Sequence, residues 1–302
     1  MKIVKRTLTA LALMMLLAAL GASSALAIEP TGEFAVFKNC PKTVTGVNLC
    51  FYSQVTSGEV TLNKQTVPIN ADTKHPITLQ GGIIFNEETE VETFVAASSG
   101  DTLSKTPQNV PGGLAGLINC TEIKGSGLLE VLARAACKAA FESGPTAVNA
   151  ITELAKPPSS ITISKANLVN REGTALGLPV KVKLENPLLG GACYIGSSTS
   201  PLQLNLTTGT TSPNPPNSPI SGEVGEIEFR HEFEIVEVKQ SKLVNNEFSA
   251  PGATGCGGIF AILLDPIINS KIGLPSANGK NTAIQFANTE EATPGAVKRS
   301  EE

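Results

Sequence analysis

The chain has 302 residues, of which 41% are hydrophobic, and a formal net charge of −4 with lysines and carboxylates interspersed. Nucleic-acid binding depends on clustered basic residues, and the sequence has no basic stripe or aromatic platform, which excludes a nucleic-acid-binding protein. Only two histidines and three scattered aspartates are available, which argues against a Ser-His-Asp triad and against a calcium loop.

The first 27 residues predict a cleavable secretory signal peptide. Three features follow in the required order, a basic start, an apolar run and a small-residue cleavage site: Lys2, Lys5 and Arg6, then Leu8 to Leu20, then Ala25-Leu26-Ala27. Cleavage would leave a mature chain that begins at Ile28, and the loss of three basic residues would change the formal net charge from −4 to −7. An uncleaved N-terminal anchor is the alternative. No membrane span is expected after cleavage.

All six cysteines lie in the mature part of the chain, and an even count in an exported protein favours disulfides. Fifteen pairings are possible. Loop length and the expected division of the chain favour Cys40 with Cys50, Cys120 with Cys137, and Cys193 with Cys256. Zinc binding is the competing use, but no C-x-x-C pair is present and neither histidine lies near a cysteine. No metal site is therefore predicted.

Residues 28–156 predict an N-terminal β-rich unit. Its runs of β-branched and aromatic residues alternate with turn signals: Phe34 to Lys38, Asn48 to Gln54, Glu59 to Asn63, Ile77 to Phe85 and Glu90 to Ala96. Gly81-Gly82 inside the fourth run indicates a bulge, a corner or a close backbone approach.

A helical segment at about residues 126–155 interrupts the β pattern. Apolar residues recur there at helical spacing: Leu128, Val131, Leu132, Ala135 and Ala139. We expect this face to pack on a sheet, with a partner-binding or membrane-active helix as the alternative. Gly144-Pro145 should end the helix, and Thr146 to Leu154 predicts a second short one.

Lys156 to Ser160 contains two prolines and is the expected domain boundary. Residues 159–289 then predict a C-terminal β-sandwich-like unit with these runs: Ile161 to Ser164, Leu178 to Glu185, Cys193 to Gly196, Leu202 to Leu206, Glu226 to Lys239 and Ala283 to Ala287. Thr207 to Gly222 carries four prolines and is expected to be a long exposed loop. Ile259 to Leu264 predicts a buried strand or the start of a helix. Residues 290–302 are charged and expected to be a disordered tail.

One charged constellation stands out, a predicted strand from Glu226 to Ile235. Strict alternation places one set of side chains on one face: Glu226, Glu228, Arg230, Glu232 and Glu234. The opposite face is predicted to be the core, with His231 as a hydrogen-bonded core residue rather than a ligand or base. We interpret the carboxylates as the solvent side of a sheet, neutralised by Lys181 and Lys183 of a neighbouring strand. A cation site or a glycosidase-type carboxylate pair is the alternative.

Three strings distributed over most of the mature chain resemble one known family: FAVFKNCP (34–41), LPVKVKLENP (178–187) and APGATGCGG (250–258). They are similar to a family of secreted proteins from high-GC Gram-positive (actinobacterial) bacteria. The resemblance implies export from a bacterial cell. It carries no catalytic motif, and the family has no established activity to transfer.

The sequence therefore predicts a mainly β, sandwich-like protein in two β-rich units with a short helical segment between them. No catalytic residue and no cofactor is predicted. The leading hypothesis is a non-enzymatic binding or structural protein, secreted or loosely associated with the cell wall, whose partner is a cell-envelope protein or glycan. The alternative is a secreted hydrolase that acts on envelope or environmental glycans through the carboxylates of Glu226 to Glu234.

Overall fold

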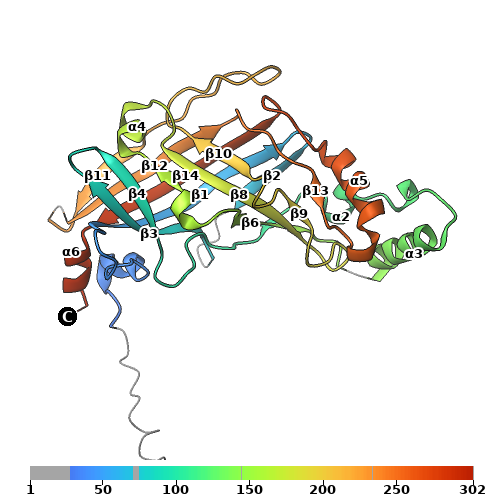
Figure 1. Ribbon diagram of the computed structural model, residues 1–302, viewed down its shortest axis with the longest axis horizontal. Helices are drawn as coiled ribbons and strands as arrows, with labels where there is room; N and C mark the ends of the chain where they lie inside the picture. Colours follow the sequence, from blue (N-terminus) through green and yellow to red (C-terminus); the bar gives the residue numbers. More distant parts are fainter. Residues whose placement is uncertain (1–27, 71–74, 144, 233, 302) are drawn as a thin grey trace, which may run out of the picture.

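The computed structural model describes residues 28–70, 75–143, 145–232 and 234–301, which form two facing antiparallel sheets (Figure 1). The strand order of the first sheet is β11 (Glu226–Arg230), β12 (Ile235–Asn245), β14 (Asn281–Ala292), β1 (Leu49–Leu62), β3 (Ile77–Asn86) and β4 (Val91–Ala96), and β2 (Gln65–Asn70) pairs with β1. The strand order of the second sheet is β13 (Ala253–Thr254), β9 (Tyr194–Ile195), β8 (Leu176–Glu185), β6 (Asn149–Leu154) and β5 (Gln108–Asn109), and β10 (Leu202–Leu206) and β7 (Thr162–Ile163) pair with β8. The mainly β, sandwich-like fold is confirmed. The predicted signal peptide, residues 1–27, lies outside the described residues.

Strand β1 is the centre of the first sheet, and it joins two strands that the sequence predicts separately. Its register with β14 shifts between Val55 and Ser57, so a bulge carries the strand through the polar residues that separate the two runs. Gly58 has φ +142°, and a Cβ there would lie 2.1 Å from the Ile284 carbonyl oxygen. Only glycine permits this approach. Gly81 in β3 likewise allows close approach, to the Val95 carbonyl, while its register with β1 and β4 continues unshifted.

The two sheets do not follow the expected boundary at Lys156 to Ser160. In the first sheet β1 pairs with β14 from Cys50↔Ala292 to Leu62↔Asn281, which joins the two ends of the described chain. In the second sheet β6 pairs with β8 across the proline segment, which forms the short 3-10 turn η3 (Pro158–Ser160). Both sheets therefore contain strands from either side of the predicted boundary, because backbone pairing is set by contacts distant in sequence.

Helices and 3-10 turns lie around the sheets (Figure 1): η1 (Gly32–Phe37), α2 (Gly113–Leu117), η2 (Cys120–Glu122), α3 (Leu128–Ser143), α4 (Lys165–Asn170), η4 (Gly258–Phe260), α5 (Ala261–Ile272) and α6 (Pro294–Arg299). Two predictions were wrong here. The expected strand Phe34 to Lys38 is η1, and the expected helix Thr146 to Leu154 contains β6, whose β-branched residues pair with β8. The expected loop Thr207 to Gly222 is irregular but partly internal, since Thr208 and Thr211 are buried. In the described part of the chain, no helix is long and apolar enough to cross a membrane.

Helix α3 presents to solvent the face that the sequence assigns to the core. Leu128, Val131 and Leu132 are exposed, whereas Ala133 and Cys137 on another side of the helix are buried. The disulfide from Cys137 to Cys120 fixes this orientation. The amphipathic pattern identifies the helix correctly, but the covalent link decides which side turns inward.

A second, smaller core lies beside the main one. Phe34 and Phe37 of η1 pack against Ile235, the Cys40–Cys50 disulfide and Val297 of α6. The expected disordered tail is therefore ordered as far as it is described. Thr293 caps α6 through its side chain, proline occupies the first turn, and apolar burial holds the helix in place.

All three predicted disulfides are present: Cys40–Cys50, Cys120–Cys137 and Cys193–Cys256. They close loops with sequence separations of 10, 17 and 63 residues. In the chain-entropy picture such cross-links stabilise a fold by about 3–4 kcal/mol each. They fit a protein that works in an oxidising compartment.

Candidate functional site

The charged segment Glu226 to Ile235 forms a hairpin rather than one strand. β11 ends at Arg230, His231 and Glu232 adopt positive φ values of +50° and +55°, and β12 begins at Ile235. Phe233 lies outside the described residues. The predicted core face is divided: Ile227 and Phe229 on the edge strand β11 are 43% and 56% exposed, whereas Ile235 at the start of β12 is buried.

His231 lies in this exposed turn and not in the core. Its side chain is 54% exposed, its ring meets Phe34 edge to face at 4.9 Å, and its Nε2 lies 3.9 Å from a carboxylate oxygen of Glu234. Glu234 also pairs with Arg299 of α6. Glu226 and Glu232 are exposed. The expected row of side chains is thus divided between a strand and a turn.

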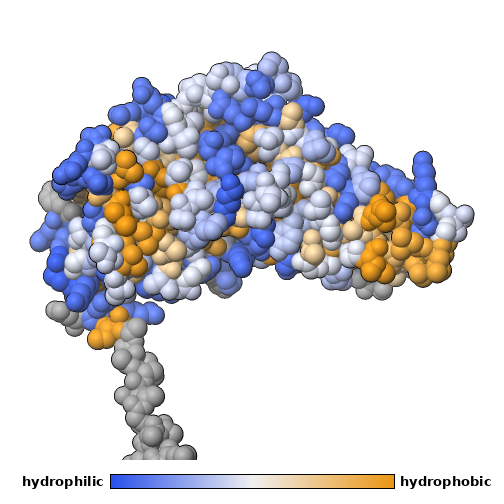
Figure 2. All heavy atoms as spheres, viewed as in Figure 1, coloured by the Kyte–Doolittle hydropathy of each residue, from blue (hydrophilic) through white to orange (hydrophobic). Residues whose placement is uncertain are grey.

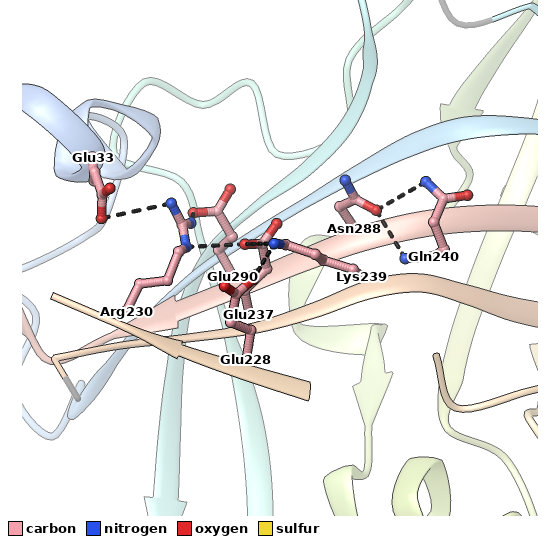
Figure 3. A network of polar contacts seen from close by, with 8 residues as sticks. All are labelled: Glu33, Glu228, Arg230, Glu237, Lys239, Gln240, Asn288 and Glu290. Carbon is pink, nitrogen blue, oxygen red and sulfur yellow. Dashed lines mark hydrogen bonds and ion pairs between the residues drawn. The ribbon is translucent and has the colours of Figure 1, made fainter. Parts of the chain in front are cut away.

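Arg230 is the centre of an ion-pair network that joins η1, β11, β12 and β14 (Figure 3). Its guanidinium lies 2.9 Å from Glu237, 2.5 Å from Glu290 and 3.6 Å from Glu33. Lys239 pairs with Glu228 and lies 3.8 Å from Glu237. The predicted row of side chains did not include Glu237 and Glu290. These residues lie on other strands, β12 and β14, and strand pairing brings them beside Arg230.

The same contacts set the electrostatics of the network. Burial raises the pKa of the Glu290 carboxyl, and Arg230 offsets part of this rise. The hydrogen bond from Lys239 lowers the pKa of Glu228. The expected partners Lys181 and Lys183 lie on the second sheet, where they pair with Glu153 and Glu185 at 3.3 and 3.2 Å. Within the predicted row, Glu228 and Glu234 pair with Lys239 and Arg299, so the expected neutralisation is present for these two carboxylates but the expected partners are wrong.

A different feature has the character of a binding site, a cavity of about 150 Å³ between the two sheets. Among the described residues, 27 line the cavity: 22 of them are Ala, Val, Leu or Ile, and none of the 27 is charged or aromatic. The second sheet contributes the alternate residues of β8: Leu176, Leu178, Val180, Val182 and Leu184. The first sheet faces them with side chains from β1, β2, β3, β12 and β14, and the cavity is partly open to the surface.

No protein-family model, no curated protein and no solved structure matches this chain. The assignment of a function therefore rests on the geometry and chemistry of the cavity itself.

The few polar groups of the cavity are all neutral: Ser53, Gln65, Gln108, Thr152 and Gln285. The Ser53 hydroxyl is 2.8 Å from that of Thr289, and the Gln65 amide donates to the Pro111 carbonyl at 3.4 Å. A buried ionised group without a partner is strongly unfavourable, so the cavity suits an uncharged molecule. Among the described residues, no three His, Cys, Asp or Glu side chains converge in a way that could hold a metal ion.

The open space reduces the stability of the fold. Cavities lower stability by about 24 cal/mol per Å³, so about 150 Å³ of unfilled apolar space costs about 4 kcal/mol. That is a large part of the 5–15 kcal/mol or so by which domains are stable.

The alternation of aliphatic and charged residues along β8 was a visible signal for an apolar face, but the side chains of one strand cannot reveal that the opposite sheet leaves space.

Proposed function

We propose that the mature chain is an extracellular binding protein that holds a small, uncharged, apolar molecule between its two sheets. The observation that carries the proposal is the aliphatic cavity of about 150 Å³, in which no described lining residue is charged. An engineered apolar cavity of roughly this size remains dry and binds benzene. The ligand, or the part of it that enters, is then about the size of one ring or a short branched chain.

Compartment and partner class follow from separate observations. The three disulfides and the expected signal peptide support an extracellular location. A glycan in the cavity is disfavoured, because its hydroxyl groups would face 22 aliphatic side chains and lose their hydrogen bonds to water. The resemblance to secreted actinobacterial proteins agrees with export.

The test is ligand binding by calorimetry and thermal unfolding, with toluene and hexanol as neutral probes and hexanoate as the charged analogue of matched length. We expect both neutral probes to bind and to raise the melting temperature, since a ligand at 100 times its Kd stabilises the native state by about 2.7 kcal/mol. Hexanoate should bind more weakly at neutral pH, because its carboxylate finds no cation among the described lining residues.

Two matched variants locate the site. Ala150→Leu adds three carbons inside the cavity and should abolish binding, whereas Ala35→Leu adds the same carbons to an exposed position on η1 and should leave binding unchanged. The proposal is wrong if no neutral probe binds, or if both variants bind as the original protein does.

A further inference from the structure

Five aliphatic side chains from α3, η4 and α5 are exposed at one end of the molecule. Leu128, Ile259 and Ile262 are 77%, 78% and 75% exposed, and Val131 and Leu132 are 47% and 48% exposed. In Figure 2 hydrophobic side chains gather at the end that α3 and α5 form in Figure 1. We call these five residues the apolar tip.

The tip is held together by contacts that fix both helices. The Cys120–Cys137 disulfide ties α3 to η2, and Arg134 of α3 donates to the carbonyls of Ile123 and Gly125 at 2.7 and 2.9 Å. Lys271 of α5 pairs with Glu122 of η2 at 2.9 Å. These contacts therefore hold in place the two helices that carry the exposed apolar side chains.

The charges around the tip indicate what kind of surface it meets. Residues 120–140 carry three basic and two acidic side chains, and α5 carries one of each, whereas the mature chain as a whole has a formal charge of −7. The tip is thus close to neutral on an acidic molecule. Because salt screens charges beyond about 10 Å, the local charge decides, and a tip close to neutral gains little from an anionic surface, while a basic partner would find no acidic cluster here.

The shape of the tip separates a lipid surface from a second copy of the chain. The tip lies at a protruding end of the molecule, and its side chains are purely aliphatic (Figure 1; Figure 2). Aliphatic side chains on a protruding surface enter the headgroup and acyl boundary of a bilayer without a complementary hollow, whereas a stable dimer needs a larger, well-packed interface. We propose that the apolar tip docks on the surface of a zwitterionic lipid bilayer.

The same helix connects the docking surface to the cavity. α5 carries Ile262 of the tip near its start, and its last residue, Ile272, lines the cavity. Leu117 of α2, a helix that packs against α5, lines the cavity as well. Ile272 follows Ile262 by ten residues, a helical rise of about 15 Å, so docking would bring one end of the cavity to about that distance from the lipid phase, where apolar molecules dissolve. Docking itself does not depend on the ligand, and only ligand transfer through it rests on the proposed function.

The test is co-sedimentation of the purified protein, with its leader removed, with phosphatidylcholine vesicles. We expect binding that does not weaken at high salt and does not increase when phosphatidylglycerol is added. Leu128→Ser with Ile262→Ser should lower the partition coefficient by about a hundredfold, because each of the two aliphatic side chains contributes about tenfold when fully buried. The control is Val91→Ser with Ile227→Ser, which removes two exposed aliphatic side chains, 55% and 43% exposed, away from the tip.

Circular dichroism melting checks that both double variants fold. Docking is refuted if the protein does not sediment with the vesicles, or if the control pair weakens binding as much as the tip pair. It is also refuted if sedimentation equilibrium shows a dimer that the tip pair dissociates while vesicle binding is absent. Vesicle binding is measured without ligand and ligand binding without vesicles, so failure of one leaves the other to be judged separately.

Discussion

Replacing Ala287 by leucine tests whether the space between the sheets is empty. Ala287 lies on β14, is 2% exposed and lines the cavity. Leucine adds three carbons, each worth about 0.8 kcal/mol when buried, and loses about 0.5–1 kcal/mol of side-chain freedom. The net gain in unfolding free energy is about 1.5–2 kcal/mol in the absence of ligand, which raises the melting temperature by about 3–8 °C.

Urea unfolding measures the gain, and the slope of free energy against urea should not change. Ala292→Leu is the control at a filled site on the same strand. Ala292 is also 2% exposed, but it packs in the second core beside Cys50 and Ile235, where overpacking costs about 1–3 kcal/mol. The two variants should therefore differ in sign. If Ala287→Leu destabilises the protein as Ala292→Leu does, the cavity is already filled and the reasoning fails.

Two further predictions concern the charged residues. Arg230→Met should lower the unfolding free energy by about 2–4 kcal/mol, since it leaves the buried Glu237 and the partly buried Glu290 without their shared cation. Lys183→Glu on the surface of the other sheet should cost much less, because an exposed ion pair is screened by water; equal losses in urea unfolding would contradict this. Burial raises the pKa of Glu291 above 4.5, so its contribution to stability is fully present below pH 4.5 and is lost as pH rises through the folded-state pKa. Glu291→Gln should therefore gain stability relative to the original protein as pH rises through that window, and a pH-independent difference would contradict the shift.

Local sequence signals predicted much of the secondary structure and all three disulfides. The alternation of Val180, Val182 and Leu184 with lysines placed β8 correctly. The hairpin of β11 and β12 was missed because its turn contains no glycine or proline. His231 and Glu232 take positive φ values there, a conformation that only a few per cent of non-glycine residues adopt.

The arrangement of the elements could not be predicted from local signals. The pairing of β1 with β14 depends on contacts between residues more than 200 positions apart. Local patterns do not show such contacts, so the sequence predicted two separate units although their strands share the same sheets. The cavity was missed for a related reason. A pattern of aliphatic residues identifies a buried face, but the volume left between two such faces depends on how far apart the sheets are held.

The long-range pairing of β1 also constrains when the protein can fold. A chain that emerges N-terminus first exposes β1 early, but its partner β14, which pairs Cys50 with Ala292, follows only about 240 residues later. Until then one edge of β1 and one edge of β12 lack β14, so the first sheet remains split into two incomplete parts. Such high contact order slows folding. The first sheet is thus completed only when its last strand, β14, pairs with β1 and β12.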